Sequence, residues 1–412
     1  MTAQSTPPPL SYARFLADHN ACFAEGRKHG WWAPFETPDG FPEVLEYDAV
    51  RELLADDTHM GAVLGDYIGD VMRANPELSP EHIAAMTESN HRALINMDGE
   101  AHHRLRSLVA RNFTPRSVAT LRPFLEKMAA ELAAVLRPGE DFMQSFARAL
   151  PARGLCALTG IPDEDHERFI GWIDELEVQA SPEELAHIDR ARSERVLAAD
   201  RSLRAYCRDL VVARRARPQD DLVSRLANDP ETHADDATIE QLLVDLIFAG
   251  NDTTRNGLGS MVLLLSQHPH AWEAVAADPS RASAVVEEVL RLESPAPGPV
   301  RQVRETFAHR DHTFGAGQTS ACSIWSANRD EAFWGADAAE FRPDREHAGQ
   351  AMTFGHGVHF CLGASLAREE MRAALVALAA AIRDVRVVEP PVMQPAGSIY
   401  GPVSLVIDFK RR

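Results

Sequence analysis

The chain lacks several features that would place it in a common class of protein. It has no CxxC pair, because its five cysteines stand far apart along 412 residues, at Cys22, Cys156, Cys207, Cys322 and Cys361. This spacing suggests neither a zinc ribbon nor a disulfide framework, and the odd number leaves at least one cysteine free. No apolar run has the length that crosses a bilayer, and the start "MTAQSTPPPL" lacks the charged-then-apolar order of a secretory signal. We therefore expect a cytoplasmic protein without a membrane segment.

Basic residues are few relative to acidic ones. The chain has 42 Lys and Arg against 61 Asp and Glu, which gives a formal net charge of −19. A strongly acidic surface repels nucleic acid and anionic lipid, so we expect neither as a partner. Glycine motifs of the Walker or dinucleotide-binding type are absent, which argues against a nucleotide or flavin domain in this chain.

The rest of the composition is that of a folded globular protein, with 45% apolar and 25% charged residues. Neither an internal repeat nor a long polar linker divides the chain, so we expect a single domain over residues 1–412. Helical periodicity dominates from about residue 115 to residue 292, and its longest stretch predicts a helix from Asp236 to Gln267. Strand-like segments are confined to residues 43–48, 306–328, 384–389 and 404–409. The predicted fold class is mainly α with small β-sheets.

One cysteine, Cys361, lies in the segment "FGHGVHFCLG", residues 354–363, which also contains three glycines. Glycine lets a backbone lie close to a bulky ligand, and a helix that begins at or next to Cys361 favours a thiolate through its dipole. A single thiolate suits a metal whose other positions are already filled, and haem iron fits that description. The alternative is a buried structural cysteine, which is the commonest role of an isolated one.

The pattern FxxGxxxCxG, formed by Phe354, Gly357, Cys361 and Gly363, resembles the haem-binding signature of the cytochrome P450 family. The resemblance implies the P450 fold, in which haem b lies between a long distal helix and a proximal cysteine loop. It implies that Cys361 is the axial thiolate ligand of the iron, with Phe354 and Gly363 also at the cofactor. Further motifs in the family's order extend the resemblance from about residue 98 to the C-terminus.

The segment "AGNDTT", Ala249 to Thr254, places residues of poor helix propensity inside the longest predicted helix. An acid beside an alcohol can hold water for proton delivery, and Asp252 and Thr253 match the family's acid–alcohol pair. The resemblance therefore implies a proton relay through Asp252 and Thr253, with Ala249 at the haem. A threonine-rich kink of purely structural origin is the alternative.

Glu288 and Arg291 in "EEVLR" match the family's ExxR motif. A spacing of three places both side chains on one face of a helix, where the usual interpretation is an exposed ion pair of little energetic weight. In the family the pair is buried and joined by an arginine from the loop before the cysteine, and Arg345 in "FRPDR" is the matching position. The resemblance gives these three residues a structural role.

Cationic side chains suit the carboxylates of haem. Four positions match the family's contacts to the haem propionates, namely His102, Arg106, Arg301 and His359. His102 and Arg106 stand four residues apart in "DGEAHHRLRSLV" and so share a helical face. The family usually reads D-P-P-E-H there, and because of this departure His103 is left as a competitor of His102.

The resemblance also implies the activity. It implies a monooxygenase, an oxidoreductase that inserts one atom of O2 into a small organic substrate, in secondary metabolism. Electrons are expected from a ferredoxin with its reductase, docked near Cys361 on the arginines of two segments, Arg104, Arg111, Arg116, Arg368 and Arg372. The alternative is a haem-thiolate protein that senses or carries a ligand without turnover, and the intact Asp252 and Thr253 favour the enzyme.

Asp245 raises a question about the substrate. It lies eight positions before Thr253, so at about 100° per residue the two side chains point nearly the same way. A carboxylate there could orient an amine or hydroxyl group of the substrate, although an acid in an amphipathic helix more often meets solvent or an arginine. The other candidates for the substrate pocket rest on position alone, and they are Phe248, Ala249, Pro297, Val300, Ile399 and Tyr400.

Overall fold

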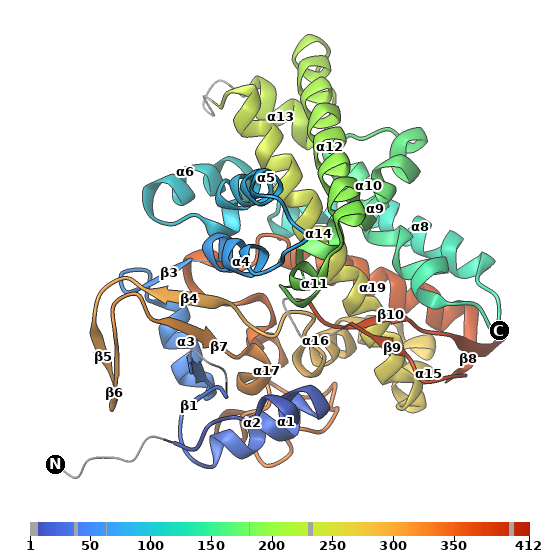
Figure 1. The fold of residues 1–412 in the computed structure, drawn as a ribbon. Helices are drawn as coiled ribbons and strands as arrows, with labels where there is room; N and C mark the ends of the chain where they lie inside the picture. Colours follow the sequence, from blue (N-terminus) through green and yellow to red (C-terminus); the bar gives the residue numbers. More distant parts are fainter. Residues whose placement is uncertain (1–6, 37–39, 63, 181, 230–233, 395–398) are drawn as a thin grey trace. The chain divides into compact units, whose positions relative to one another are not determined.

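The structure is a computed structural model that describes residues 7–36, 40–62, 64–180, 182–229, 234–394 and 399–412. Its ribbon is shown in Figure 1. The chain divides into two compact units, each made of two stretches. The first unit comprises Met1–Leu64 and Glu287–Cys361, and the second comprises Gly65–Val286 and Leu362–Arg412. That the whole chain acts as one domain stays a prediction.

The first unit contains a five-stranded sheet of short strands in the order β1-β2-β7-β4-β3. The pairing of β2 with β7 is parallel, and the other three pairings are antiparallel. The strands are β1 (Trp32–Pro34), β2 (Pro42–Val44), β3 (Met60–Ala62), β4 (Val300–Val303) and β7 (Thr319–Cys322), and β5 (Phe307–His309) pairs with β6 (His312–Phe314) as a separate hairpin. A buried apolar cluster that includes Val44, Leu53, Phe314 and Trp334 packs against this sheet.

Short helices complete the first unit. They are α1 (Tyr12–Ala17), α2 (His19–Arg27), α3 (Tyr47–Ala55), α17 (Ile324–Ala327) and α18 (Glu331–Trp334), followed by the single 3₁₀ turns η6 (Ala348–Gln350), η7 (Met352–Phe354) and η8 (Gly357–His359). Helix α16 (Ala282–Leu292) crosses the boundary and carries its C-terminal half into this unit.

The second unit is mainly helical. Its longer helices are α4 (Leu64–Arg73), α5 (Pro80–His91), α6 (Gly99–Ala110), α8 (Arg122–Val135), α9 (Ala149–Thr159), α10 (His166–Leu176), α12 (Arg190–Ala216), α14 (Asp236–Ser266), α15 (Pro269–Ala277) and α19 (Ala364–Ala381). Shorter elements are α7 (Pro115–Ala119), α11 (Pro182–His187), α13 (Leu222–Asn228), η1 (Leu94–Asn96), the π-helical turn η2 (Met143–Ala147), η3 (Asp163–Asp165), η4 (Glu177–Ala180) and η5 (Pro279–Arg281). Two small antiparallel sheets pair β8 (Ile382–Val387) with β11 (Ile407–Arg411), and β9 (Val392–Met393) with β10 (Pro402–Ser404).

Helix α14 is the central element of the second unit and contacts α9, α12 and α19 (Figure 1). Its start is fixed by Asp235, whose side chain accepts a hydrogen bond from the Thr238 N–H as an N-cap. Within the helix, Gly259 allows close packing, because an added Cβ would lie 2.5 Å from the Met143 sulfur. In the part of the chain that the structure describes, no helix combines the length and apolar character needed to cross a membrane.

Most predicted elements are confirmed, including the long helix from Asp236 and the mainly α class with small sheets. Three strand predictions are partly wrong. Residues 404–409 do not form one strand, because β10 ends at Ser404 and β11 begins at Ile407. In residues 43–48 the strand ends at Val44 and α3 begins at Tyr47, because Tyr47, Val50 and Leu53 recur at helical spacing and are buried. In residues 306–328 the last part forms α17 instead of a strand, with Ser323 as its N-cap. Strands β1, β3 and β4 are too short to give a periodic signal in the sequence.

Candidate functional site

The cysteine loop lies at the end of the first unit and ends on an exposed thiol. The Cys361 N–H donates to the Phe354 carbonyl at 2.8 Å, which closes the loop between them. Gly357 has φ +74°, and an added Cβ there would lie 2.4 Å from the Leu54 carbonyl oxygen. Any other residue would therefore be strained and would push the loop away from α3. Hydrogen bonding and close backbone contact hold the Cys361 loop in one shape.

The helix after this cysteine begins later than the sequence predicts. Helix α19 starts at Ala364, with Gly363 at its N-cap, so Cys361 lies outside the helix. The expectation of a helix at or next to Cys361 is therefore wrong by about one turn. Gly363 and the preceding residues form a turn instead, which is consistent with the low helix propensity of glycine.

Hydrogen bonds fix the segment before the loop onto α16. The Thr353 hydroxyl donates to the Leu290 carbonyl at 2.7 Å and accepts from the Asn328 amide at 3.1 Å. The Asn328 side chain also accepts from the Met352 N–H at 2.6 Å. Because Thr353 and Asn328 are both buried, these bonds anchor the loop more firmly than exposed ones would.

The three residues of predicted structural role come together, Glu288 and Arg291 from α16 and Arg345 from the segment between α18 and η6. The Arg291 guanidinium donates to both carboxylate oxygens of Glu288 at 2.7 and 2.8 Å, and both side chains are 0% exposed. Arg345 donates to the same carboxylate at 3.4 Å. Arg291 also donates to the carbonyls of Asn328 and Ala338 at 2.6 Å each. In such a buried network, removal of one partner costs on the order of 3–5 kcal/mol, since it leaves a buried charge without compensation.

The acid–alcohol pair lies in the middle of α14, in the second unit. Asp252 is buried, and its Oδ1 accepts from the Asn251 amide at 3.0 Å. Its Oδ2 has no hydrogen-bond partner among the described residues. Burial, and next the negative charge of Glu177, raise the pKa of Asp252 to about 7. The carboxyl group can therefore both hold and release a proton near neutral pH.

Thr253 lies on the more exposed side of the same helix. Its hydroxyl donates to the Ala249 carbonyl at 2.9 Å, one turn back. Ala249 is exposed and Thr253 partly exposed, whereas Asp252 and Thr254 are buried. The helix continues through this segment without a break. The middle of α14 thus presents a small, partly polar face away from the protein interior, bordered by a buried acid.

Two buried charged residues near the middle of α14, Arg255 and Glu370, are not among the residues predicted from the sequence. Arg255 donates to Glu177 at 3.1 Å and lies 3.8 Å from Asp174, and its side chain is buried. On α19, the buried Glu370 interacts with the Thr254 hydroxyl, and burial raises the pKa of its carboxyl well above the usual range. The signal in the sequence is a charged residue on an otherwise apolar helical face, at Arg255 and at Glu370.

The predicted propionate contacts divide between the two units. His102 and Arg106 lie on α6 in the second unit, where His102 is 3% exposed while the competing His103 is exposed. In the first unit, Arg301 lies buried on β4, and His359 lies in η8, two residues before the cysteine. Because His102 is buried and His103 is exposed, His102 is the one of the two whose side chain the surrounding fold holds in place.

The candidates for the substrate pocket are spread in the same way. Asp245, Phe248 and Ala249 lie on α14, and Ile399 and Tyr400 precede β10 in the second unit. Pro297 and Val300 lie in the first unit, at and before β4, where the Pro297 carbonyl accepts from the Ile324 N–H at 2.7 Å. Both oxygens of Asp245 accept hydrogen bonds from the protein, from Leu94 N–H at 2.8 Å and from the Gln241 amide at 2.7 Å.

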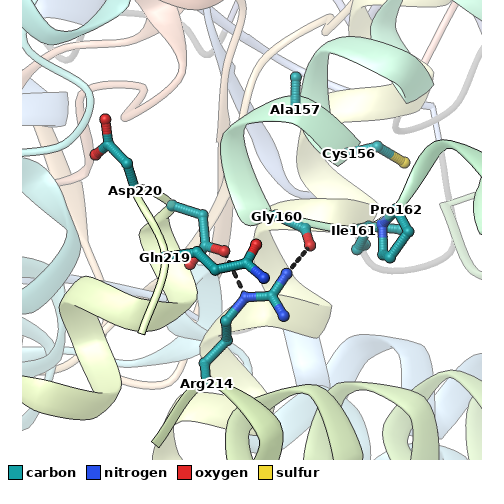
Figure 2. A pocket seen from close by; sticks show the side chains of 9 residues that line it. Cys156, Ala157, Gly160, Ile161, Pro162, Arg214, Gln219 and Asp220 are labelled. Carbon is teal, nitrogen blue, oxygen red and sulfur yellow. Dashed lines mark hydrogen bonds and ion pairs between the residues drawn. The ribbon is translucent and has the colours of Figure 1, made fainter. Parts of the chain in front are cut away.

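A cavity of about 470 Å³ lies elsewhere in the second unit and contains none of the predicted site residues. Figure 2 shows Arg214 directed at Gly160, with a hydrogen bond to that carbonyl. Arg214 also donates to the Asp221 carboxylate. Gly160 has φ +87°, and an added Cβ would collide with Asp221. Arg214, Asp221 and the Gly160 carbonyl bond with one another, so we assign this cavity to the packing of α9, α12 and α13.

Cys361 differs from the other four cysteines in its accessibility. It is exposed, while Cys22, Cys156, Cys207 and Cys322 are buried. Burial raises the pKa of Cys207 and of Cys322 to about 12, so both remain thiols. An accessible sulfur on a glycine-shaped loop is the donor expected of a thiolate ligand for haem iron, and Cys361 is the cysteine that fits.

Comparison with known proteins gives the family. The family model described as "Cytochrome P450" matches residues 212–380. The erythromycin C-12 hydroxylase of Saccharopolyspora erythraea is 37% identical over 68% of this chain and 70% of its own length. The chain belongs to the cytochrome P450 family. The mycinamicin IV hydroxylase/epoxidase of Micromonospora griseorubida is another relative, 35% identical over 83% of this chain and 82% of its own length.

Solved P450 structures show the same fold. The structure of cytochrome P450 CYP109Q5 from Chondromyces apiculatus matches with a TM-score of 0.83, 27% identity and coverage of 97% of each chain. As a P450, this protein is a monooxygenase of the oxidoreductase class, and its family carries haem with a cysteine thiolate ligand. The predicted family, fold class and enzyme class are confirmed.

Proposed function

We propose that this P450 binds haem b through the Cys361 thiolate and inserts one oxygen atom from O2 into a small organic molecule of secondary metabolism. The observation that carries the proposal is the solvent exposure of the five cysteines, because Cys361 is exposed and the other four are buried. The glycine-shaped loop and its anchoring to α16 support it, because a metal ligand has to be held in place. Phe354, Gly363 and Ala249 would lie at the cofactor, as the resemblance implies.

Four cationic side chains would hold the haem propionates. They are His102, Arg106, Arg301 and His359, whose charge and donors suit carboxylates. Support for His102 over His103 comes from its burial on α6. Glu288, Arg291 and Arg345 would have a structural role, since their network fixes the segment that leads into the cysteine loop.

The protein's own part in the reaction is proton delivery and exclusion of water. When bound, a haem with a thiolate ligand supplies the cleavage of the O–O bond and the attack on a C–H bond. Asp252 would hold and release a proton near neutral pH, because burial raises its pKa to about 7. Thr253, the next residue, would complete the relay as the resemblance implies, and its hydroxyl donates to the Ala249 carbonyl at 2.9 Å.

Electrons would come from a ferredoxin with its reductase, docked on basic residues of the second unit. Arg104 and Arg116 are exposed there and support this role. Arg111 and Arg372 already form ion pairs, with Asp229 and with Glu126, so they contribute less free charge. We therefore assign the docking contact mainly to the exposed Arg104 and Arg116, and Arg368, which is partly exposed on α19, is the remaining candidate.

Two kinds of observation favour a catalyst over a ligand sensor. Relatives at 34–37% identity are named as hydroxylases or as a polyketide biosynthesis enzyme. The chain also retains Asp252 and Thr253, which a sensor does not need. The names of these relatives support a secondary metabolite as the substrate.

The test is turnover with isotopically labelled dioxygen. Compounds that shift the haem absorption of the purified protein would be incubated with reduced ferredoxin and its reductase under labelled O2. We expect one labelled oxygen atom per product molecule, and a strong loss of product with Asp252→Asn. A protein that binds such compounds and accepts electrons, yet forms no labelled product, would be the sensor instead.

A further inference from the structure

The turn η1 (Leu94–Asn96) is partly exposed to solvent. It contains no buried residue, and Ile95 is 60% exposed. Ala93 at its N-cap offers no side-chain oxygen to the turn. Its backbone bonds are local, such as the Asn96 N–H to the Ala93 carbonyl at 2.9 Å. A turn of this kind needs an anchor from another element to adopt a single position.

Asp245 on α14 provides that anchor. Its Oδ2 accepts from the Leu94 N–H at 2.8 Å, and its Oδ1 accepts from the Gln241 Nε2 at 2.7 Å. Gln241 in turn accepts from Arg204 on α12 at 2.9 Å, and Arg204 is paired with Asp200 at 3.0 Å. A continuous hydrogen-bond chain therefore runs from α12 across α14 to the backbone of η1.

We propose that Asp245 is a positioning residue whose carboxylate fixes the Leu94–Asn96 turn to α14 and so sets where α6 begins. Helix α6 starts at Gly99, three residues after the turn, and carries His102 and Arg106. The consequence for the enzyme rests on the proposed function, in which those two side chains hold haem propionates. Both oxygens of Asp245 are engaged by the protein, which supports positioning of the turn over direct contact with a substrate.

The anchor depends on the charge of Asp245. A carboxylate accepts at both oxygens, whereas a protonated carboxyl turns one oxygen into a donor and cannot keep both bonds. Burial raises the pKa of Asp245 to about 6, opposed by the Leu94 and Gln241 donors and by the cations Arg204 and Arg92. The anchor is therefore complete at pH 7.5 and weakens as the pH falls through 6.

Hydrogen exchange of the purified protein, read by mass spectrometry on peptides that cover residues 91–98, tests the proposal. Asp245→Leu removes both acceptors, and we expect exchange in this segment about 10 to 100 times faster, the effect of one charge-assisted hydrogen bond. Glu88→Gln, an equal change of charge at an exposed site on the preceding helix, is the matched control and should leave the segment unchanged. Exchange within twofold of the unmodified protein in Asp245→Leu would overturn the proposal.

A second variant separates anchoring from general damage. Asp245→Asn keeps one oxygen for the Leu94 N–H but does not titrate. We expect protection of residues 91–98 to fall between pH 7.5 and 5 in the unmodified protein and to stay constant in Asp245→Asn, after correction for intrinsic exchange. Equal pH dependence in the two proteins would contradict the proposal, even if Asp245→Leu fails to fold. These readouts measure backbone exchange and not turnover, so they are independent of whether the proposed function holds.

Discussion

Among single residues, Asp252 has the most unusual environment for its role. It is a carboxyl group inside a helix, buried on all sides, with one oxygen that has no partner in the described chain. Glu177 adds a second negative charge nearby, and Arg255 reduces its effect by pairing with it. The proton affinity of Asp252 is therefore set by the surrounding helices as well as by its own burial.

This arrangement predicts how the pH profile depends on Glu177. As a proton donor, Asp252 is active in its protonated form, so turnover should fall as the pH rises through about 7. Glu177→Gln removes a charge that raises the pKa of Asp252, and we expect the fall in turnover to move to lower pH. Steady-state rates between pH 5.5 and 9 measure the shift.

The control is Glu175→Gln, the same change one position from the end of α10, where Glu175 pairs with Arg195 at 3.2 Å. It should leave the profile in place. An unchanged profile in Glu177→Gln, with a normal profile in the control, would show that Asp252 does not control the rate through its protonation.

Among secondary structure elements, the cysteine loop depends most on one glycine. Gly357→Ala places a Cβ 2.4 Å from the Leu54 carbonyl at φ +74°, so the loop has to move away from α3. We expect a clear drop in the fraction of protein with thiolate-ligated haem, measured from the reduced carbon monoxide spectrum. Gly349→Ala, where an added Cβ meets nothing within 4 Å, should keep the normal fraction.

Equal haem fractions in both alanine variants would mean that close contact with α3 does not position Cys361. Gly355 extends the comparison. Like Gly357 it has a positive φ, of 70°, but an added Cβ would meet nothing within 4 Å. Its alanine variant is expected to fall between the other two, since it is strained without a collision.

For the molecule as a whole, the sequence predicts the parts that local pattern determines. The long helix α14 is predicted to within a residue at its C-terminus, because its apolar periodicity and the Asp235 cap are local signals. Strands β1, β3 and β4 of the first unit are not predicted, because they are short and β3 and β4 are distant in sequence and gain their stability from pairing.

The residues of the candidate site are likewise predicted only in part. Motif spacing predicts Cys361, Asp252 and the Glu288–Arg291 pair, because the residues of each motif lie close together in the sequence. The acidic residues beside Asp252, Glu177 and Asp174, come from other elements, and the contact of Asp245 with Leu94 joins α14 to η1. Only the tertiary structure brings such residues together, so periodicity could place Asp245 on a helical face but could not find its partner.

The central claim is that the Cys361 sulfur is the ligand of the haem iron. The most direct measurement is the absorption spectrum of the reduced, carbon monoxide-treated protein, compared among the unmodified protein, Cys361→Ser and Cys207→Ser. We predict the red-shifted band of a thiolate ligand in the unmodified protein and in Cys207→Ser, which alters a buried cysteine. The band should be absent in Cys361→Ser. If Cys361→Ser retained it, or if the unmodified protein lacked it with haem bound, the account would be contradicted.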